Sequence, residues 1–397
     1  MSTPCSRRKL LKSAVLGATF ASRSFARAQA APPARVAIAK CSTYDSSELL
    51  PVLSRMFDQI GGLGRLAKGK TVAIKINLTG QLFYRIGYLT PEDTCWTHPA
   101  VIGSVVHLMG RAGARRIRIL EGAFSTGEPL EEFMLQANWE PLDIMNAAPK
   151  VEFENTNTLG SGKKYSRFAV PHGGYIFKAY DLNHSYEECD VFVSIAKLKE
   201  HATAGITLTM KNCFGATPIS IYGDSAGEDE PNENPTGGRN MMHTGHRQPS
   251  KCALPENDPA SPRQAGYRIP RIVADIVAAR PVDLAVIDGI KSVAGGEGAW
   301  IPGVKPVSPG VLIAGTNCVS TDAVGTAVMG YDPMAGRGAP PFAVGRLSES
   351  CDNMLQLAED LGVGTRDLKR IEVAGTPISG ARCNFAAMHT ATPAKRR

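Results

Sequence analysis

The sequence of 397 residues lacks any C-x-x-C pair, although it contains nine cysteines. Because the cysteines are scattered, no local set of thiolates is spaced to hold an iron–sulfur cluster or a structural zinc ion. No G-x-G-x-x-G turn follows a predicted strand either, which argues against a dinucleotide site. The cofactor is therefore unknown at this stage: there is no iron–sulfur motif and no dinucleotide motif, and a divalent metal is the open alternative.

Long apolar runs are missing after residue 30. No later segment stays apolar for the ~18 residues of a membrane-spanning helix, so we expect no transmembrane segment after signal removal.

Acidic residues are missing from residues 1–30, which hold six lysines and arginines. Removing those six from the 44 basic residues leaves 38 against 37 acidic residues. This balance removes the case for nucleic-acid binding.

The first thirty residues resemble a twin-arginine (Tat) export signal. Arg7-Arg8 precedes a short, weakly apolar stretch, and Ala28-Gln29-Ala30 follows as a small-residue cleavage site. We therefore expect residues 1–30 to be the signal and residues 31–397 to form a single α/β domain. The Tat translocase would be the export partner, and the protein would act in the periplasm or otherwise outside the cytoplasm. A flexible basic N-terminus with a chance arginine pair is the alternative.

Short β-branched runs alternate with helical patterns along the rest of the chain. The runs are apolar on both faces, as a sheet covered by helices on both sides requires. We therefore predict an α/β fold with a mostly parallel sheet and helices on both faces. The expected strands are 35–40, 71–77, 115–120, 190–196, 283–288 and 310–315, and the expected helices are 46–59, 99–111, 270–279 and 321–329.

Residues 222–268 depart from this pattern. They are rich in glycine, proline, asparagine and acidic residues and have almost no aliphatic periodicity, so we expect a long irregular insertion loop. His243 and His246 form an H-x-x-H pair within it. The segment is either a lid that captures a metal or covers a substrate, or a solvated insertion, and its composition favours the solvated insertion.

Polar residues follow the predicted strands repeatedly. Ligands of open α/β sheets bind beyond the carboxyl ends of the strands, so we expect a site at that edge. The residues in these positions are Lys75, Asn77, Glu121, Lys197, Lys199, His201, Asp288, Thr316, Asn317 and Asp322.

Five stretches of the chain resemble domain-of-unknown-function family 362. They are VAIKINLTG, THPAVIGSVVHLMGRAGA, DVFVSIAKLKEHATAGITLTMKNCFG, LAVIDGI with the glycine-rich loop after it, and VLIAGTNCVSTDAVGTAVMGYDP, in order over about residues 70–335. The K-L-K-x-H, G-x-T-x-x-x-K-N and D-A-V blocks are specific in combination. The family's reaction is not established, and some members carry a ferredoxin module. Because this chain lacks the cysteines of that module, we expect a Tat-exported member without it.

Lys197, Lys199 and His201 are the candidate catalytic residues. In an extended segment their period-two spacing puts all three on one face. Two ammonium groups beside an imidazole suit a phosphate, a carboxylate or an enolate-like intermediate. Neighbouring cations also lower a lysine pKa, which suits a base or a Schiff-base nucleophile. Spacing alone favours an exposed lysine loop, whereas the family resemblance favours a site.

Lys75, Asn77, Lys211 and Asn212 are the candidate substrate-binding residues. Lys75 interrupts an apolar strand, where a buried ammonium group requires a partner such as a carboxylate. Lys211 and Asn212 end a helix expected from residue 204. A lysine is favourable at that end of a helix even without a function.

Asp288, Glu297 and Asp322 are the candidate metal ligands. Carboxylate oxygens completed by water suit a hard divalent ion such as Mg²⁺. For Asp322, an ordinary acidic residue in the first turn of a helix is an equally good interpretation.

These residues leave three classes of function open. The first is an enzyme that acts on a small anionic substrate at the carboxyl ends of the strands, with or without a divalent metal. The second is a non-catalytic periplasmic binding or cofactor-delivery protein with the same anion cradle. The third is a redox protein whose cofactor is loaded before export.

Overall fold

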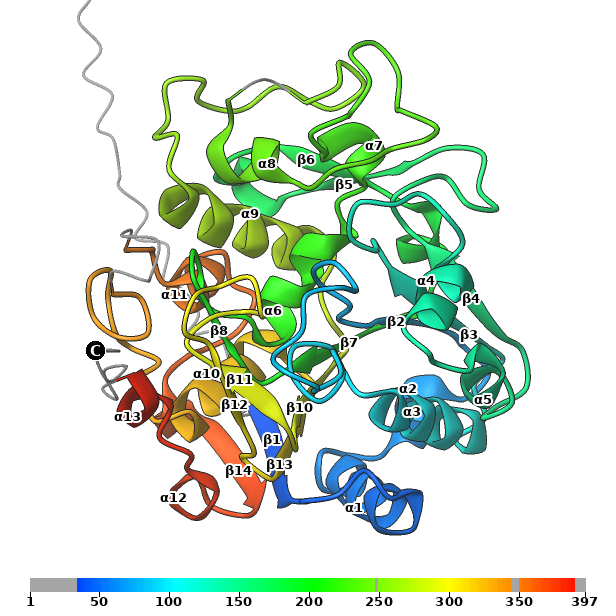
Figure 1. Cartoon of the computed structure of the whole chain (residues 1–397), viewed down its shortest axis with the longest axis vertical. Helices are drawn as coiled ribbons and strands as arrows, with labels where there is room; N and C mark the ends of the chain where they lie inside the picture. The colour runs from blue at the N-terminus through cyan, green and yellow to red at the C-terminus, as the bar shows by residue number, and fades with distance from the viewer. Residues whose placement is uncertain (1–33, 247–248, 344–349, 390–397) are drawn as a thin grey trace, which may run out of the picture. The chain divides into compact units, whose positions relative to one another are not determined.

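An eight-stranded sheet lies at the centre of the protein, with the strand order β14-β1-β13-β10-β7-β2-β3-β4 (Figure 1). The computed structural model describes residues 34–246, 249–343 and 350–389, and the predicted signal at residues 1–30 lies outside them. The strands of this sheet are β1 (Ala34–Lys40), β2 (Thr71–Lys75), β3 (Arg116–Glu121), β4 (Val151–Asn155), β7 (Val191–Lys197), β10 (Leu284–Gly289), β13 (Val311–Gly315) and β14 (Ile371–Gly375). Three two-stranded ribbons pair β5 (Ser166–Ala169) with β6 (Ala179–Leu182), β8 (Glu200–His201) with β9 (Gly205–Ile206), and β11 (Ser292–Ala294) with β12 (Lys305–Val307).

Seven of the eight strands run in one direction, and β13 alone runs against its neighbours β10 and β1. Between β10 and β13 the chain forms only the β11–β12 ribbon and no crossover helix. Since a crossover is what returns a chain to the same edge of a sheet, β13 enters from the opposite edge. The predicted mostly parallel α/β sheet is confirmed.

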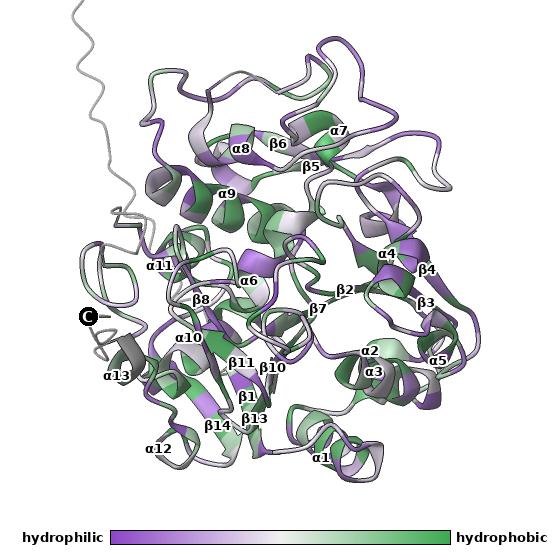
Figure 2. Cartoon of the chain, viewed as in Figure 1, coloured by the Kyte–Doolittle hydropathy of each residue, from purple (hydrophilic) through white to green (hydrophobic). Residues whose placement is uncertain are grey.

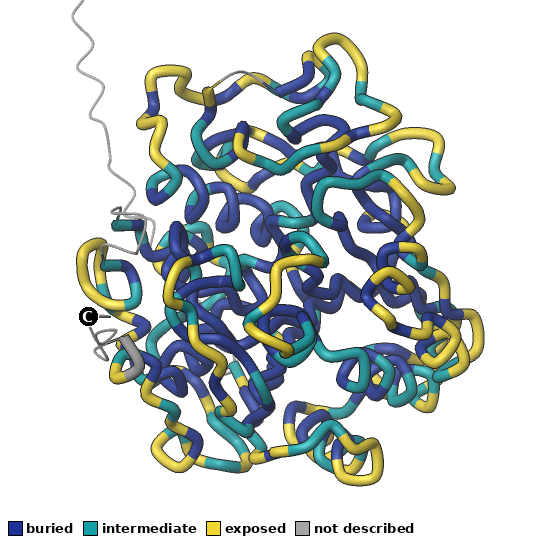
Figure 3. Tube along the Cα trace, in the orientation of Figure 1, coloured by how far each residue is buried: buried dark blue, intermediate teal, exposed yellow. Residues whose placement is uncertain are grey.

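Helices cover both faces of the sheet, and each face has its own apolar core (Figures 1 and 2). In β2, Val72 and Ile74 pack into one core and Ala73 into the other, as the alternation of a strand requires. Figure 3 shows buried residues gathered at the centre of this part of the chain and most exposed residues on the peripheral loops. The helices are α1 (Ser46–Gln59), α2 (Leu63–Ala67), α3 (Pro99–Arg111), α4 (Leu130–Gln136), α5 (Pro141–Met145), α6 (Leu208–Asn212), α7 (Ile219–Tyr222), α8 (Asn240–Thr244), α9 (Ala265–Ala279), α10 (Cys318–Val328), α11 (Met354–Asp360), α12 (Ile378–Ala381) and α13 (Phe385–His389).

The predicted helices agree with the structure at their ends in two cases, α1 and α3. The helix expected from Pro270 begins five residues earlier, at Ala265. Pro270 has no amide to donate to Gly266, but the Gly266 carbonyl accepts from the Asp352 amide instead, at 3.0 Å. The proline is therefore tolerated inside the helix. Within the described residues, no helix has the length and apolar content to cross a membrane.

The helix expected from residue 204 begins instead at Leu208, because residues 200–206 form the β8–β9 hairpin. The helix expected from Thr321 begins at Cys318, where the side chain of Asn317 caps it. Asp322 is therefore inside α10 and not in its first turn, and the ordinary role considered for it does not apply.

The segment 222–268 is largely irregular, and all but residues 247–248 are described. It contains α8 and then leads into α9. Met241 and Met242 of α8 are each 1% exposed and pack into the core on the α9 side of the sheet. This part of the insertion is therefore anchored by apolar burial, in contrast to a solvated loop.

A buried ion pair joins β7 to β10 at their carboxyl ends. Lys197 lies opposite Asp288 in the sheet, and its Nζ donates to Asp288 Oδ2 at 2.9 Å, with both side chains fully buried. The same Nζ donates to the Glu92 carbonyl at 2.8 Å and to the Tyr44 hydroxyl at 3.1 Å. Asp288 also accepts from the His98 amide at 3.1 Å. The pair therefore fixes two loops onto the strand ends.

We predict that Lys197→Met lowers the free energy of unfolding by about 3–5 kcal/mol, because it leaves the Asp288 carboxylate buried without its cation. The matched control is Lys291→Met. Lys291 pairs with Asp93 at 2.9 Å with a side chain that is 44% exposed, so its loss should cost at most about 1 kcal/mol. Urea denaturation measures both, and equal losses would contradict the prediction.

Candidate functional site

A cavity of about 500 Å³ opens beyond the carboxyl ends of β2, β3 and β7. Five segments that are distant in the sequence contribute to it. Figure 1 shows α6 near β2 and β7, close to the centre of the view. The charged and histidine side chains of its lining are Lys75, Glu121, His201, Lys211, Arg239, His243 and Glu297.

Lys75 and Glu121 form a buried ion pair in the wall of this cavity. Lys75 Nζ donates to Glu121 Oε1 at 2.5 Å and to the Ile76 carbonyl at 2.7 Å. Glu121 Oε2 accepts from the Leu78 amide at 2.8 Å. Burial lowers the pKa of Lys75, and the charge of Glu121 opposes that effect. Because both charges are satisfied within the protein, this pair shapes the site and adds no net charge to it.

Asn212 links α6 to two strands of the sheet. Its Nδ2 donates to Ser194 Oγ at 3.0 Å and to the Ile195 carbonyl at 3.2 Å, both on β7. Its Oδ1 accepts from Asn77 Nδ2 at 3.1 Å and from Lys75 Nζ at 3.3 Å. Asn77 and Asn212 both line the cavity, and their amides fix the distance between α6 and the end of β2.

Asp322 holds the start of α6. Its carboxylate accepts from the Thr209 amide at 3.0 Å, from Thr209 Oγ1 at 2.5 Å and from the Met210 amide at 2.8 Å. Burial raises the pKa of Asp322 to about 7, although these three donors oppose it. The preceding Leu208 has a φ of 44°, a left-handed conformation that costs a non-glycine residue about 1–2 kcal/mol. The Asp322 contacts stabilise this strained entry, and so they position the residues that follow.

Lys211 is the exception among the buried lysines of this region. Its side chain is half-buried in the cavity lining, and its Nζ lies 4.4 Å from the centre of the Phe214 ring. Among the described residues, no hydrogen bond or ion pair of this amino group is found. Burial lowers the pKa of Lys211 to about 7. The charge of Glu297 opposes this, and the nearby cations Lys199 and Arg239 reinforce it.

The two histidines of the cavity present different hydrogen-bonding groups. His201 Nδ1 accepts from the Thr203 amide at 3.2 Å, so the proton of the neutral ring is on Nε2. His243 Nδ1 lies 2.7 Å from the Arg239 carbonyl, which only accepts, so Nδ1 is protonated and Nε2 is an acceptor. Burial lowers the pKa of His201 well below its usual value and that of His243 to about 4. Both rings are therefore neutral at pH 7.

Trp300 closes one side of the cavity beside Tyr84, with 5.6 Å between the ring centres. Its indole nitrogen donates to Glu297 Oε1 at 3.3 Å. A Cβ atom added at Gly80 or at Gly298 would lie 2.2 Å from this indole ring. Neither position therefore accepts a side chain while the ring stays in place.

The candidate catalytic residues do not share one surface in the structure. His201 lines the cavity, but Lys197 and Lys199 do not. Lys197 is paired with Asp288, and Lys199 Nζ donates to the carbonyls of Cys95 at 2.6 Å and Glu297 at 3.0 Å. Burial lowers the pKa of Lys199 to about 8. The strand ends at Lys197, so the period-two argument does not extend to the two later residues.

The three candidate metal ligands have separate partners. Asp288 is paired with Lys197, Asp322 caps α6, and Glu297 Oε2 accepts from the Ala202 amide at 2.8 Å. Only Glu297 lines the cavity. In the part of the chain that the structure describes, no group of three or more His, Cys, Asp or Glu side chains is arranged to hold a metal ion.

Arg239 is the charged residue of the cavity lining that the sequence did not single out. Its Nε donates to the Thr217 carbonyl at 2.8 Å and its Nη2 to Asn157 Oδ1 at 2.8 Å. Burial lowers the pKa of Arg239 to about 10. A signal was present, because Arg239 and His243 are four residues apart and so share one face of a helix. The irregular composition around them concealed it.

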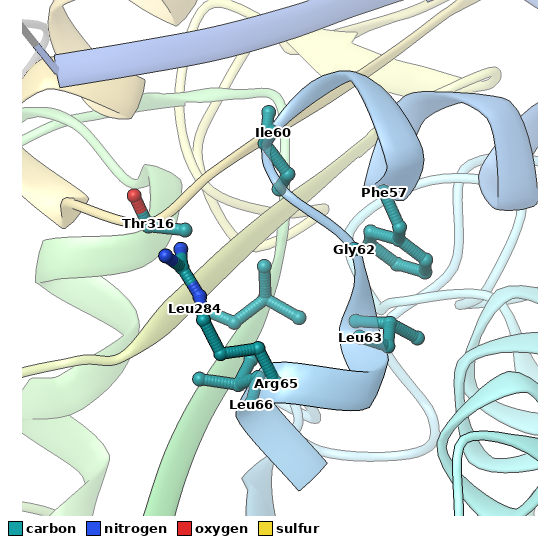
Figure 4. A pocket seen from close by; sticks show the side chains of 8 residues that line it. All are labelled: Phe57, Ile60, Gly62, Leu63, Arg65, Leu66, Leu284 and Thr316. Atoms are coloured by element: carbon teal, nitrogen blue, oxygen red, sulfur yellow. The ribbon is translucent and has the colours of Figure 1, made fainter.

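Thr316 and Asn317 lie at the opposite edge of the sheet, because β13 runs against its neighbours. A small cavity of about 80 Å³ lies at that edge, between α1, α2 and the start of β10 (Figure 4). Its lining is mostly apolar, with Phe57, Leu63 and Leu284 among the side chains. The expectation that residues following this strand belong to the site is therefore wrong for Thr316 and Asn317.

We predict that Lys211 reacts with acetic anhydride with a midpoint near pH 7, because its amino group loses its proton there. Competitive labelling between about pH 5 and pH 9 followed by peptide mass analysis measures this. Glu297→Gln should move the midpoint to lower pH, since the carboxylate charge raises the pKa of Lys211. The exposed Lys68 is the internal control. Identical pH profiles for Lys211 and Lys68 would contradict the prediction.

Comparison with known proteins gives matches to one family, to a curated protein and to several solved structures. The thylakoid-associated protein sll1697 of Synechocystis sp. is 29% identical over 190 residues, which cover 46% of this chain and 50% of that protein. The chain thus matches about half the length of this curated relative.

Two solved structures each have a TM-score of 0.34, a level that carries no argument about fold or function. One is a protein from Thermotoga maritima, at 13% identity over 68% of this chain and 55% of that one. The other is the lactate racemase apoprotein from Thermoanaerobacterium thermosaccharolyticum, at 12% identity over 69% and 54%.

The family model described as a domain of unknown function, DUF362, matches residues 72–327. The match covers more than half of the chain and includes every residue that lines the cavity. The chain therefore belongs to the DUF362 family.

Proposed function

We propose that this protein is an enzyme that binds a small anionic substrate in the 500 Å³ cavity and moves a proton on it. The observation that carries the proposal is the amino group of Lys211, which lines the cavity without an ion-pair or hydrogen-bond partner among the described residues. A cation in such a place is available to a ligand.

The charge of the lining supports an anion. Lys75 and Glu121 neutralise each other, which leaves Lys211 and Arg239 against Glu297. Glu297 is occupied by the Ala202 amide and the Trp300 indole nitrogen. A small carboxylate or phosphate therefore finds an excess of positive charge, and charge-assisted hydrogen bonds are stronger than those between neutral groups.

The two neutral histidines support proton transfer. His201 offers an N–H donor at Nε2 and His243 offers an acceptor at Nε2, as their Nδ1 contacts require. A donor and an acceptor in one cavity can polarise an oxygen of the substrate and receive a proton from it. A binding protein without catalysis needs the cations but not this arrangement.

We predict that acetate and phosphate raise the Tm of the purified protein. Lys211→Met should weaken their binding by about ten-fold or more, as expected for the loss of one charge-assisted hydrogen bond. Isothermal titration measures the affinities, with Lys68→Met as the control that removes an exposed charge. No binding to the unmodified protein would overturn the proposal.

Catalysis is separated from simple binding by exchange with solvent. A panel of small carboxylic acids in D₂O, followed by NMR, should show enzyme-dependent deuterium incorporation for at least one member. His243→Gln should abolish the exchange and leave acetate binding within about three-fold. Retained binding with no exchange by the unmodified protein would favour the non-catalytic binding function.

We also propose that the protein is exported by the Tat translocase and acts in the periplasm. The support is the Arg7-Arg8 pair with the apolar stretch and cleavage site that follow it. The paired variant Arg7→Lys, Arg8→Lys should leave the uncleaved protein inside a bacterial host, as cell fractionation would measure. Unchanged export of that variant would contradict the proposal.

A further inference from the structure

We propose that Lys211 forms a Schiff base with a small 2-oxo acid bound in the cavity. This inference rests on the proposed function and names its substrate class. An anion-binding site needs only a charge, whereas the surroundings of Lys211 also provide what a nucleophilic amine requires.

The lysines that surround the site differ in the contacts of their amino groups. Lys75, Lys197 and Lys199 each donate to carboxylate or carbonyl oxygens at 2.5–3.0 Å. In these contacts each amino group is held as an ammonium group, which has no lone pair with which to attack a carbonyl carbon. Lys211 lies instead over the face of Phe214, at 4.4 Å. Among the described lysines near the cavity, it is the one whose amino group is free to meet a ligand.

The amino group of Lys211 is also unprotonated often enough to attack a carbonyl carbon. Burial with Lys199 and Arg239 nearby brings the pKa of Lys211 to about 7, so about half of it is unprotonated at neutral pH. Desolvation beside other cations is a known way to activate a lysine nucleophile. The protonated fraction of Lys211 supplies the charge that an anion meets, and the unprotonated fraction can attack a carbonyl carbon.

The cavity also holds a second cation for the carboxylate of the same substrate. Arg239 Nε and Nη2 donate to protein oxygens, and no hydrogen bond of its Nη1 is found among the described residues. A 2-oxo acid places a carboxylate one bond away from a carbonyl carbon. Arg239 would hold the carboxylate while Lys211 meets the carbonyl.

The reaction balances with the groups of the cavity and water. The neutral Nζ of Lys211 adds to the carbonyl carbon, while the N–H at His201 Nε2 donates to the carbonyl oxygen. The proton lost by nitrogen passes through His243 Nε2 to that oxygen and gives the carbinolamine. A second proton from solvent lets the hydroxyl leave as water, and the product is the protonated imine.

Reductive trapping tests the inference. The full chain is incubated with pyruvate and sodium cyanoborohydride at pH 7, and peptide mass analysis locates the reduced adduct. We expect one adduct, at Lys211, with at least a ten-fold lower yield at every other lysine. Lys211→Arg should remove it, and Lys199→Arg should retain it. Adducts spread evenly over exposed lysines such as Lys68 would overturn the inference.

A matched pair of probes tests the role of the anion. Pyruvate and its methyl ester carry the same carbonyl group, but only the acid is charged. We expect trapping at Lys211 to be at least ten-fold faster with the acid, whereas exposed lysines show no such preference. Equal rates at Lys211 would overturn the assignment of a 2-oxo acid.

The outcomes separate the two proposals. Acetate binding without a pyruvate adduct at Lys211 leaves the anion site standing and overturns the Schiff base. An adduct at Lys211 without acetate or phosphate binding supports the nucleophile and overturns the general anion site. The absence of both overturns both.

Discussion

Buried lysines at the carboxyl ends of the central strands each require an oxygen partner, because burial removes their amino groups from solvent. This requirement organises the edge of the sheet. Lys75 takes Glu121 from the neighbouring strand β3, and Lys197 takes Asp288 from the neighbouring strand β10. Through these contacts the loops that surround the cavity are fixed to the strands by electrostatics and not only by apolar packing.

Most charged groups at this edge of the sheet have hydrogen-bond or ion-pair partners within the protein, and this distinguishes Lys211 from them. Lys199 is held by two carbonyl groups, and Glu297 by an amide and an indole. Lys211 has no such partner among the described residues, and α6 presents it because Asp322 and Asn212 hold that short helix from opposite ends. A site of this kind is preorganised, since the surrounding polar groups need not rearrange when a ligand arrives.

The sequence was informative wherever a strand is buried on both faces. Such strands are continuous apolar runs, and six of them were predicted. The edge strands β4 and β14 were missed, because β4 reads VEFEN and alternates polar with apolar residues, and β14 is largely exposed. The start of α6 was misplaced because its cap, Asp322, comes from a residue 113 positions away from Thr209. A hydrogen-bond partner so distant in the sequence leaves no signal in the residues near the start of the helix.

The site residues follow the same division. Lys75, Asn77, Lys211, Asn212 and His201 were found because they follow apolar strands or lie in the family motifs, and they all line the cavity. Lys197 and Lys199 have the same residue type and similar positions, yet their partners across the fold give them other roles. The sequence shows that a lysine is present, but only the three-dimensional contacts show whether its amino group is already occupied.

The position of the Trp300 ring limits how this cavity can change by mutation. The ring lies against the backbone at Gly80 and at Gly298, so a side chain at either glycine would require the indole to move. Replacements at these three positions must therefore occur together or in a compensating order. The irregular segment that carries Arg239 and His243 is under no comparable restriction from this ring. Divergence of ligand preference among related chains should accordingly concentrate in that segment, while the tryptophan and its two glycines are inherited as a set.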